Sequence, residues 1–365
     1  MLEGLLLNGH QIDMVTAVPN PHHVAYDESL AVSGVHTTRI EMNQVQKLAG
    51  LSKNKLFLFL KSIAYRWMTR HEVYDHLKSM VNHLDCVDLK TNQYDYIISS
   101  SDPKSSHLFV LKLLEQQRES FRGKWIQIWG DPFFADITQK SKNARKIKEE
   151  EYRLLKAADM VFYVSQLTLE QQKRMYPACS EKMRYTPIPY VQEVVAETRK
   201  LRGALTVELA YCGDYSPDVR NLEPLYETVN MSNNLHLVIC GGSSKPFQTT
   251  EAVLVKGRVP YSVTCEVENN ADILVFVANK AGGQIPGKIY QYAGTNKPIL
   301  FILDGDSRTL KEQFAKYDRF IFADNTRQSI ERGIREIIDN DSMYSPLAEF
   351  SKEYIMSEFI SNISQ

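Results

Sequence analysis

The stretch ADILVFVANKAGGQIPGKIYQY, residues 271–292, carries the pattern that decides the fold of this 365-residue chain. It opens with a short apolar run typical of a buried strand, passes through a glycine-rich turn and continues into a helix. A helix that begins after such a turn presents free backbone N–H groups and the positive end of its dipole, which favour an anion. Lys288 in the first helical turn is unfavourable for that dipole unless it has an anionic partner. The pattern therefore predicts a phosphate site, although a plain loop whose lysine points to water explains the spacing equally well.

Strand-like and helix-like segments alternate on both sides of this stretch, which predicts βα units around mostly parallel sheets. The expected strands are residues 11–18, 94–99, 124–129, 159–164, 207–212, 235–240, 252–255, 272–277 and 298–303. The expected helices include residues 106–119, 142–158, 219–229, 288–293 and 346–363. Pro187 and Pro189 end the first cluster of strands, so we place a domain boundary after them.

The predicted fold is α/β, with two Rossmann-like domains that face each other across a cleft. Residues 1–195 form the N-terminal domain and residues 196–345 the C-terminal domain, while residues 346–365 hold a last helix that crosses back to the first domain. The chain opens with a helical face at Leu2 and Leu5 rather than with a strand, so the first strand of the N-terminal domain is expected to be missing. A longer reading frame or a truncated copy would explain this opening, and the upstream codons would decide.

The composition excludes several classes of protein. An apolar fraction of 43% with a net charge of −1 rules out a disordered chain. The longest apolar run, residues 273–278, is far shorter than the ~20 residues of a membrane-spanning helix. The five cysteines include no C-x-x-C pair, which suits buried free thiols in a reducing cytosol and argues against a zinc site. Residues 1–200 carry 27 basic and 23 acidic side chains, and residues 201–365 carry 16 basic and 21 acidic ones. Neither half is as basic as a nucleic-acid-binding protein usually is.

Three further turns follow expected strands of the second domain. Gly213 ends one strand, and Gly241 and Gly242 end the next. Arg258 and Val259 lie in a turn that can offer backbone groups to a flat heteroaromatic ring or can merely reverse the chain. Ligands of open α/β sheets bind beyond the carboxyl ends of the strands, so these turns are expected to converge with the glycine-rich one on a single crevice.

The order and spacing of these motifs resemble those of GT-B fold glycosyltransferases, in particular the retaining family 4 group and its relatives in polysaccharide assembly. The resemblance covers nearly the whole chain, and it depends on the order of the motifs rather than on any single one. The matching stretches are NGHQI (8–12), WGDPF (129–133), AADMV (157–161), AYCG (210–213), RNL (220–222), LVICG (237–241), GRVP (257–260), NADILV (270–275), IPGKIYQY (285–292) and KPIL (297–300).

This resemblance implies transfer of a sugar from a nucleotide-sugar donor of the UDP or GDP type, with retention of configuration and without a metal or other cofactor. Lys288 and Arg220 would stabilise the charge on the leaving diphosphate. The family's ribose-binding carboxylate falls on Gln291, which can donate and accept hydrogen bonds but not as a charged group. The expected donor-binding residues are Gly213, Gly241, Gly242, Arg258, Val259, Gln284, Ile285, Pro286, Gly287, Lys288 and Gln291.

The first domain supplies the acceptor side in this reading, with a carbohydrate or a lipid-linked sugar as the acceptor. Ser101 and His107 follow the strand of residues 94–99 and are expected to contact it. Asp131 follows the strand of residues 124–129, where it either orients the acceptor as a catalytic group or caps a turn.

Three other patterns receive structural explanations. Residues 101–104 match S-x-x-K, but Pro103 and the loop around it favour a helix cap over a nucleophile. Residues 304–306 spell the metal-binding D-x-D of another glycosyltransferase fold, yet turn and helix-cap chemistry explain them better. The mixed charges of residues 140–151 predict a solvated helix face.

Residues 56–68 form a helical stripe rich in leucine and aromatic side chains, and residues 43–71 contain six basic and no acidic side chains. Such a helix can lie on an anionic membrane surface or can pack on its own domain. The opening residues contain no basic n-region, so we expect no secretory signal and a cytoplasmic location, with a peripheral position on the cytoplasmic membrane face if the helix lies on a membrane. Binding to liposomes that requires acidic lipid, measured by flotation, would support the membrane explanation.

Two other functions suit the same architecture. A nucleotide-sugar epimerase would need a carboxylate and histidine set in the cleft, and the sequence does not provide one. A catalytically silent binding or partner subunit is favoured by Gln291, by Gly283 at the position of the family's other glutamate and by the missing first strand. Nucleotide release in the presence of an acceptor would distinguish a transferase from a silent protein.

Overall fold

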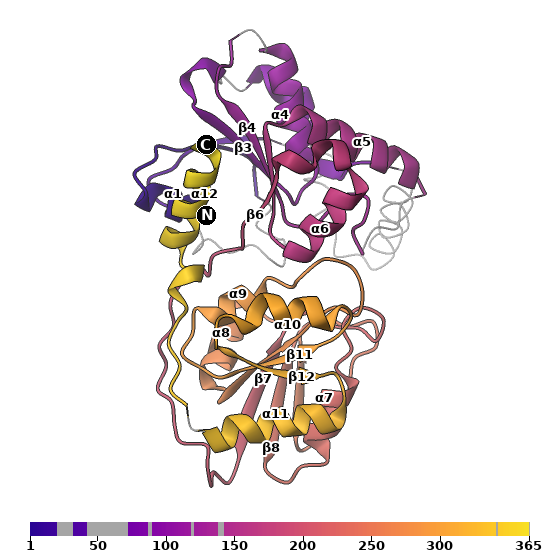
Figure 1. Ribbon diagram of the computed structural model, residues 1–365, viewed down its shortest axis with the longest axis vertical. Helices are drawn as coiled ribbons and strands as arrows, with labels where there is room; N and C mark the ends of the chain where they lie inside the picture. Colours follow the sequence, from indigo (N-terminus) through magenta and orange to yellow (C-terminus); the bar gives the residue numbers. More distant parts are fainter. Residues whose placement is uncertain are drawn as a thin grey trace. The chain divides into compact units, whose positions relative to one another are not determined.

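The computed structural model describes residues 1–19, 32–41, 72–86, 90–117, 120–137, 142–340 and 342–364. The chain divides into two compact units, one mainly of residues 4–186 and one mainly of residues 187–361, which we call the N-terminal and the C-terminal unit. Both units are α/β, with helices between parallel strands (Figure 1). The predicted α/β class with two Rossmann-like domains is confirmed.

The C-terminal unit is built on one parallel sheet of six strands in the order β12-β11-β10-β7-β8-β9. Figure 1 shows α9 and α10 over one face of the sheet and α7 and α11 over the other. Because both faces are covered, the inner strands are continuously apolar, and every residue of β10 and β11 is buried. The strands are β7 Val207–Cys212, β8 Leu235–Cys240, β9 Val253–Gly257, β10 Ile273–Val277, β11 Ile299–Leu303 and β12 Phe320–Asp324. The helices are α7 Glu223–Asn230, α8 Tyr261–Asn270, α9 Lys288–Ala293, α10 Ser307–Ala315 and α11 Arg327–Asn340.

The described strands of the N-terminal unit form two parallel sheets, one of four strands in the order β3-β4-β5-β6 and one of β1 and β2. No described strand joins β1 to β3, although a Rossmann-like order would make one sheet of them. The strands are β1 Asp13–Ala17, β2 His36–Ile40, β3 Tyr96–Ser100, β4 Lys124–Trp129, β5 Met160–Tyr163 and β6 Met183–Tyr185. The described α-helices of this unit are α1 Leu2–Leu7, α4 Ser105–Gln116, α5 Ala144–Ala157 and α6 Gln166–Met175. The last helix, α12 Lys352–Ser364, falls mainly in the C-terminal unit.

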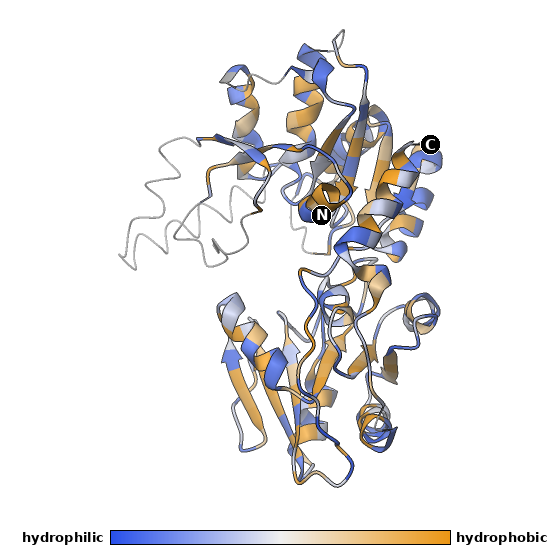
Figure 2. Cartoon of the chain, turned by 90° about the vertical axis from the view of Figure 1, so that its left-hand side faces the viewer, coloured by the Kyte–Doolittle hydropathy of each residue, from blue (hydrophilic) through white to orange (hydrophobic). Residues whose placement is uncertain are grey.

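All nine expected strands are present, and those at 124–129, 207–212 and 235–240 keep their predicted bounds. Figure 2 shows the apolar strands and the amphipathic helices that the hydrophobic pattern predicts. As expected, Cys179, Cys212 and Cys240 are buried free thiols, whereas the free thiol of Cys265 is only partly buried. The expected helix over residues 56–68 lies outside the described residues. Among the helices that are described, none is long and apolar enough to cross a bilayer.

Candidate functional site

The turns after β7, β8 and β9 meet at the carboxyl edge of the six-stranded sheet. The backbone N–H of Gly213 donates to Cys240 O at 2.8 Å, and that of Gly241 donates to Gly257 O at 2.7 Å. A Cβ atom on Gly241 would lie 1.9 Å from Gly213 O, so only glycine allows this approach. The structure therefore brings together three of the turns that the sequence singled out.

Arg220, in the connection between β7 and α7, is fixed over these turns by neutral partners. Its Nη1 donates to Asp214 O at 2.6 Å, and its Nη2 donates to Asn279 Oδ1 at 2.9 Å. Asn279 in turn donates from Nδ2 to Gln284 O at 2.9 Å, which ties the arginine to the glycine-rich turn. Arg220 forms no ion pair with any described residue, so its charge is available to an anionic ligand in a fixed orientation.

Arg258, after β9, is bound instead by a carboxylate. Asp214 Oδ1 accepts from Arg258 Nε at 3.0 Å and from the backbone N–H of Gly242 at 2.7 Å, and Asp214 Oδ2 pairs with Arg258 Nη2. The guanidinium and the N–H group hold the pKa of the Asp214 carboxyl below its usual range. Asp214 thus links the ends of three strands.

Lys288 begins α9 as predicted, but its anionic partner belongs to the protein. Its Nζ lies 2.5 Å from Glu268 Oε1 of α8 and over the ring of Tyr292. Both charged side chains are largely buried, with exposed fractions of 24% and 14%. The unfavourable position of a lysine at a helix N-terminus is therefore explained without a phosphate.

Residues 188–191, at the beginning of the C-terminal unit, cover the start of α9 on one side. Gln291 Oε1 accepts from the backbone N–H of Val191 at 2.8 Å, and its Nε2 donates to Pro189 O at 3.2 Å. The Cδ1 atom of Ile188 lies 3.4 Å from where a Cβ atom on Gly287 would sit. Gln291 therefore fastens this segment to α9 with both ends of its amide. Around the turn, Gln284 and Ile285 are buried, while Val259, Pro286 and Gly287 are half-buried.

In the N-terminal unit, Ser101 and Asp131 lie close together where β3 and β4 end. Ser101 Oγ accepts from the backbone N–H of Gly130 at 3.2 Å. The ammonium of Lys104 donates to Asp131 O at 2.8 Å and pairs with Asp102. Residues 101–104 lead directly into α4, whose N-cap residue is Lys104, but this residue makes no side-chain capping bond, and the N–H of Ser105 donates instead to Asp75 Oδ2 at 3.0 Å.

His107 lies inside this unit rather than on its surface. Its exposed fraction is 0%, its Nδ1 lies 2.7 Å from Ser99 Oγ, and its ring stacks on Trp129 at 4.2 Å between centroids. Burial, and secondarily the charge of Lys104, bring its pKa well below the usual value, so the ring is neutral at physiological pH.

The charged residues 145, 146, 148 and 149 are exposed, as predicted for a solvated helix face over residues 140–151, but Glu151 of α5 is an exception. It is fully buried and accepts from the backbone N–H of Phe133 at 2.8 Å, that of Phe134 at 3.1 Å and Tyr176 OH at 2.7 Å. It therefore shapes the turn that contains Asp131. The spacing contains the signal, because position 151 falls four residues after Ile147 and three before Leu154, on the apolar stripe of the helix.

Asp306 is a helix cap, as predicted. It precedes α10 and accepts from the backbone N–H of Thr309 at 3.2 Å, while Asp304 accepts from Asn325 Nδ2 at 2.9 Å. Within the described part of the chain, no group of three His, Cys, Asp or Glu side chains could hold a metal ion.

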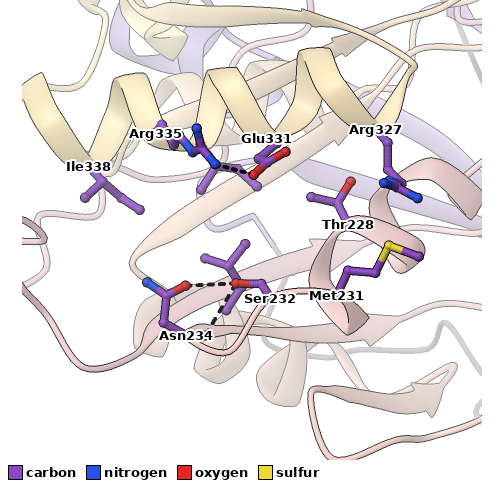
Figure 3. A pocket seen from close by; sticks show the side chains of 10 residues that line it. Thr228, Met231, Ser232, Asn234, Arg327, Glu331, Arg335 and Ile338 are labelled. Carbon is purple, nitrogen blue, oxygen red and sulfur yellow. Dashed lines mark hydrogen bonds and ion pairs between the residues drawn. The ribbon is translucent and has the colours of Figure 1, made fainter.

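A pocket of about 540 Å³ lies between α7 and α11, at the amino end of β8 (Figure 3). Arg335 and Glu331 pair on its α11 side, and Met231 and Asn234 line the opposite side. None of the predicted site residues borders it. Since ligands of open α/β sheets bind at the carboxyl ends of strands, this pocket is at the wrong edge for the predicted site.

No protein-family model matches the chain, and a search of curated proteins finds no match. Solved structures do match its fold. The crystal structure of HepE from Anabaena with UDP and glucose aligns with a TM-score of 0.58 over 97% of this chain and 100% of that chain, at 10% identity. The chain has the GT-B fold.

Two further GT-B structures agree. The lipopolysaccharide outer core galactosyltransferase WaaB aligns with a TM-score of 0.53 at 12% identity, over 97% of this chain and 99% of that chain. A glycosyltransferase from Rickettsia africae aligns with a TM-score of 0.55 at 11% identity, over 97% of this chain and 98% of that chain. The fold expected from the sequence is thereby confirmed.

Sequence reasoning missed Asp214, Asn279 and Glu268. Asp214 and Asn279 lie directly beyond β7 and β10, so the rule that places ligands at strand ends could have found them. Glu268 gives no such signal, because its pairing with Lys288 depends on how α8 packs beside α9.

Proposed function

We propose that this protein is a glycosyltransferase that moves a sugar from a UDP- or GDP-type donor to a carbohydrate or lipid-linked acceptor. We assign the donor to residues 196–345 and the acceptor to residues 1–195. The observation that carries the proposal is the cluster of glycine turns beyond β7, β8 and β9, beside which Arg220 is fixed without an ion pair to any described carboxylate. Support for a UDP-type donor comes from HepE of Anabaena, whose crystal contains UDP.

The leaving nucleotide diphosphate gains negative charge as the bond to the sugar breaks. Arg220 is oriented by Asn279 and by Asp214 O before any ligand arrives, so it can stabilise this charge without rearranging. Lys288 would add a second charge if Glu268 releases it. We assign transfer with retention and without a metal, on the sequence resemblance.

On the acceptor side, we propose that Asp131 and Ser101 position the hydroxyl group that receives the sugar. Lys104 holds the turn of Asp131 by a hydrogen bond to Asp131 O, and Glu151 holds the same turn by accepting from the backbone N–H of Phe133. His107 would act only by supporting β3 and β4, since its ring has no exposed surface. The sequence resemblance to polysaccharide-assembly enzymes favours a role in cell-surface glycan synthesis at the cytoplasmic membrane face.

A catalytically silent GT-B subunit is the second candidate. Two observations favour it: Gln291, at the ribose-binding position of the family, is hydrogen-bonded at both ends to backbone, and Lys288 is paired with Glu268. A silent protein would still bind a nucleotide sugar at Arg220 but would not release the nucleotide.

A panel of UDP- and GDP-sugars tested for thermal stabilisation identifies the donor, because a ligand selective for the native state raises the melting temperature. Calorimetry then gives the affinity for the wild type, for Arg220→Gln and for Arg335→Gln, an arginine of the same unit at the other edge of the sheet. We expect Arg220→Gln to weaken binding about tenfold or more and Arg335→Gln to leave it unchanged. Nucleotide release with an acceptor mixture then separates transferase from silent subunit, and absence of nucleotide binding to the wild type contradicts both.

A further inference from the structure

The turn cluster contains one group that sugar transfer does not explain. A site for a diphosphate gathers positive charge and N–H donors, yet Asp214 places a carboxylate among them. Asp214 links the three turns in the free protein, but its side chain is 52% exposed, so a bound anion can reach the same donors.

The groups that donate hydrogen bonds to Asp214 form a set suited to a phosphate group. Arg258 presents Nε and Nη2 in parallel to the two carboxylate oxygens, and the backbone N–H of Gly242 adds a third hydrogen bond at 2.7 Å. A guanidinium fork together with a backbone N–H at a glycine turn is a common way to bind a phosphate. The carboxylate therefore stands where an anionic oxygen of a ligand would bind.

Displacing this carboxylate costs little. The side chains of Arg258 and Asp214 are 62% and 52% exposed, and such exposed pairs are weak because water and salt screen them. A ligand phosphate that is also bound by Arg220 can compete for Arg258 and Gly242, whereas a neutral ligand cannot.

We propose that Asp214 is an internal competitor for the donor's diphosphate: it covers Arg258 and Gly242 N–H in the free protein and is displaced when the donor binds. This inference rests on the proposed function, since it takes the anion to be the donor's diphosphate. Arg220 supplies the permanent charge, and Arg258 becomes available only when Asp214 leaves. Asp214 thereby lowers the affinity for every anion and makes binding depend on the second contact at Arg220.

The test compares the affinities of the wild type, Asp214→Asn and Asp218→Asn for UDP and for inorganic pyrophosphate by calorimetry at low ionic strength. Asp218 is an exposed aspartate of the same turn, so its variant removes the same charge without uncovering Arg258. We expect Asp214→Asn to bind both anions about three- to fivefold more tightly than Asp218→Asn, because it loses an exposed ion pair of that strength. Damage to the fold cannot produce such a gain. An asparagine at position 214 could still accept hydrogen bonds from Arg258 and Gly242, so the shorter Asp214→Ser is the second variant.

A double variant checks the assignment to Arg258. If Asp214 acts by covering Arg258, the gain from Asp214→Asn falls to less than twofold in an Arg258→Gln background. Equal or weaker binding by both position-214 variants, compared with Asp218→Asn, would overturn the inference while leaving the proposed function intact. Tighter pyrophosphate binding by Asp214→Asn without any binding of UDP or GDP would show that Asp214 covers an anion site, but it would refute the proposed function and, with it, the donor's diphosphate as the displacing anion. Failure of all these proteins to bind UDP, GDP or pyrophosphate would overturn both.

Discussion

Both units place ionisable side chains beside the turns at the carboxyl ends of their parallel strands, but with opposite accessibility. In the N-terminal unit, Glu151 and His107 are fully buried, and Lys104 is 7% exposed. In the C-terminal unit, the Asp214–Arg258 pair is more than half exposed. Glu151 and Lys104 hold the turn of residues 131–134 with buried hydrogen bonds, whereas the exposed pair can be exchanged for a ligand at little cost. The position of a polar group in a fold therefore does not reveal its role until its burial is known.

The largest effect is expected from Glu151→Ala in the N-terminal unit. It leaves the N–H groups of Phe133 and Phe134 and the hydroxyl of Tyr176 without their buried acceptor, which should lower the free energy of unfolding by about 3–5 kcal/mol. Urea unfolding followed by tryptophan fluorescence measures this, since all three tryptophans precede residue 130. Glu149→Ala, on the exposed side of the same helix, should change it by less than about 0.5 kcal/mol. Equal effects of the two variants would contradict the buried role of Glu151.

The second effect concerns the contact that brings the turns of the C-terminal unit together. Gly241→Ala would place a Cβ atom 1.9 Å from Gly213 O, and relieving the clash should cost about 3 kcal/mol. Gly213→Ala is the matched control, because its Cβ atom would meet only side-chain atoms at 3.3 Å or more. Thermal unfolding should show a much lower melting temperature for Gly241→Ala, and similar melting temperatures would mean that the turns are not in contact.

The third prediction is a pH dependence located in the N-terminal unit. Burial lowers the pKa of His107 in the folded state, so below the unfolded value of 6.5 only the unfolded chain takes up the proton. Stability from this group is complete above pH 6.5 and is lost as the pH falls, by about 1.4 kcal/mol per pH unit. His107→Gln should flatten the profile of unfolding free energy between pH 6.5 and 5 relative to the wild type. An unchanged slope in His107→Gln would assign the pH dependence to other groups.

The smallest expected effect is the difference in stability between variants of two aspartate–arginine pairs of the C-terminal unit. Asp272 accepts from Arg199 Nε at 2.8 Å and from Glu208 N at 2.8 Å, and it is only 10% exposed. Asp272→Asn should lower the free energy of unfolding by about 1–2 kcal/mol, whereas Asp214→Asn should change it by less than about 1 kcal/mol. Chemical unfolding of the two variants measures the difference. A larger loss in Asp214→Asn would make that carboxylate structural and would weaken the case for its displacement.

Much of the fold follows from local pattern. The apolar runs of β10 and β11 and the glycine turns after β7 and β8 predict a parallel sheet, because continuous burial and tight turns leave few alternatives. The strands missed were β2, β6 and β12, which are short or lie at sheet edges and so lack a continuous apolar run. Helix α9 was predicted with its bounds, since the turn before it and the glycine after it mark both ends.

The sequence by itself determined which turns would lie at the carboxyl edge, since the order of strands and glycines is written in the chain. Only the tertiary structure decided the partners of the charges there: Glu268 for Lys288, Asp214 for Arg258, and, among the described residues, neutral hydrogen-bond acceptors for Arg220. The reason is physical. Strand and helix patterns depend on neighbours in sequence, whereas the partner of a charge is set by side chains from elements far apart in the chain, packed within a few ångströms of each other.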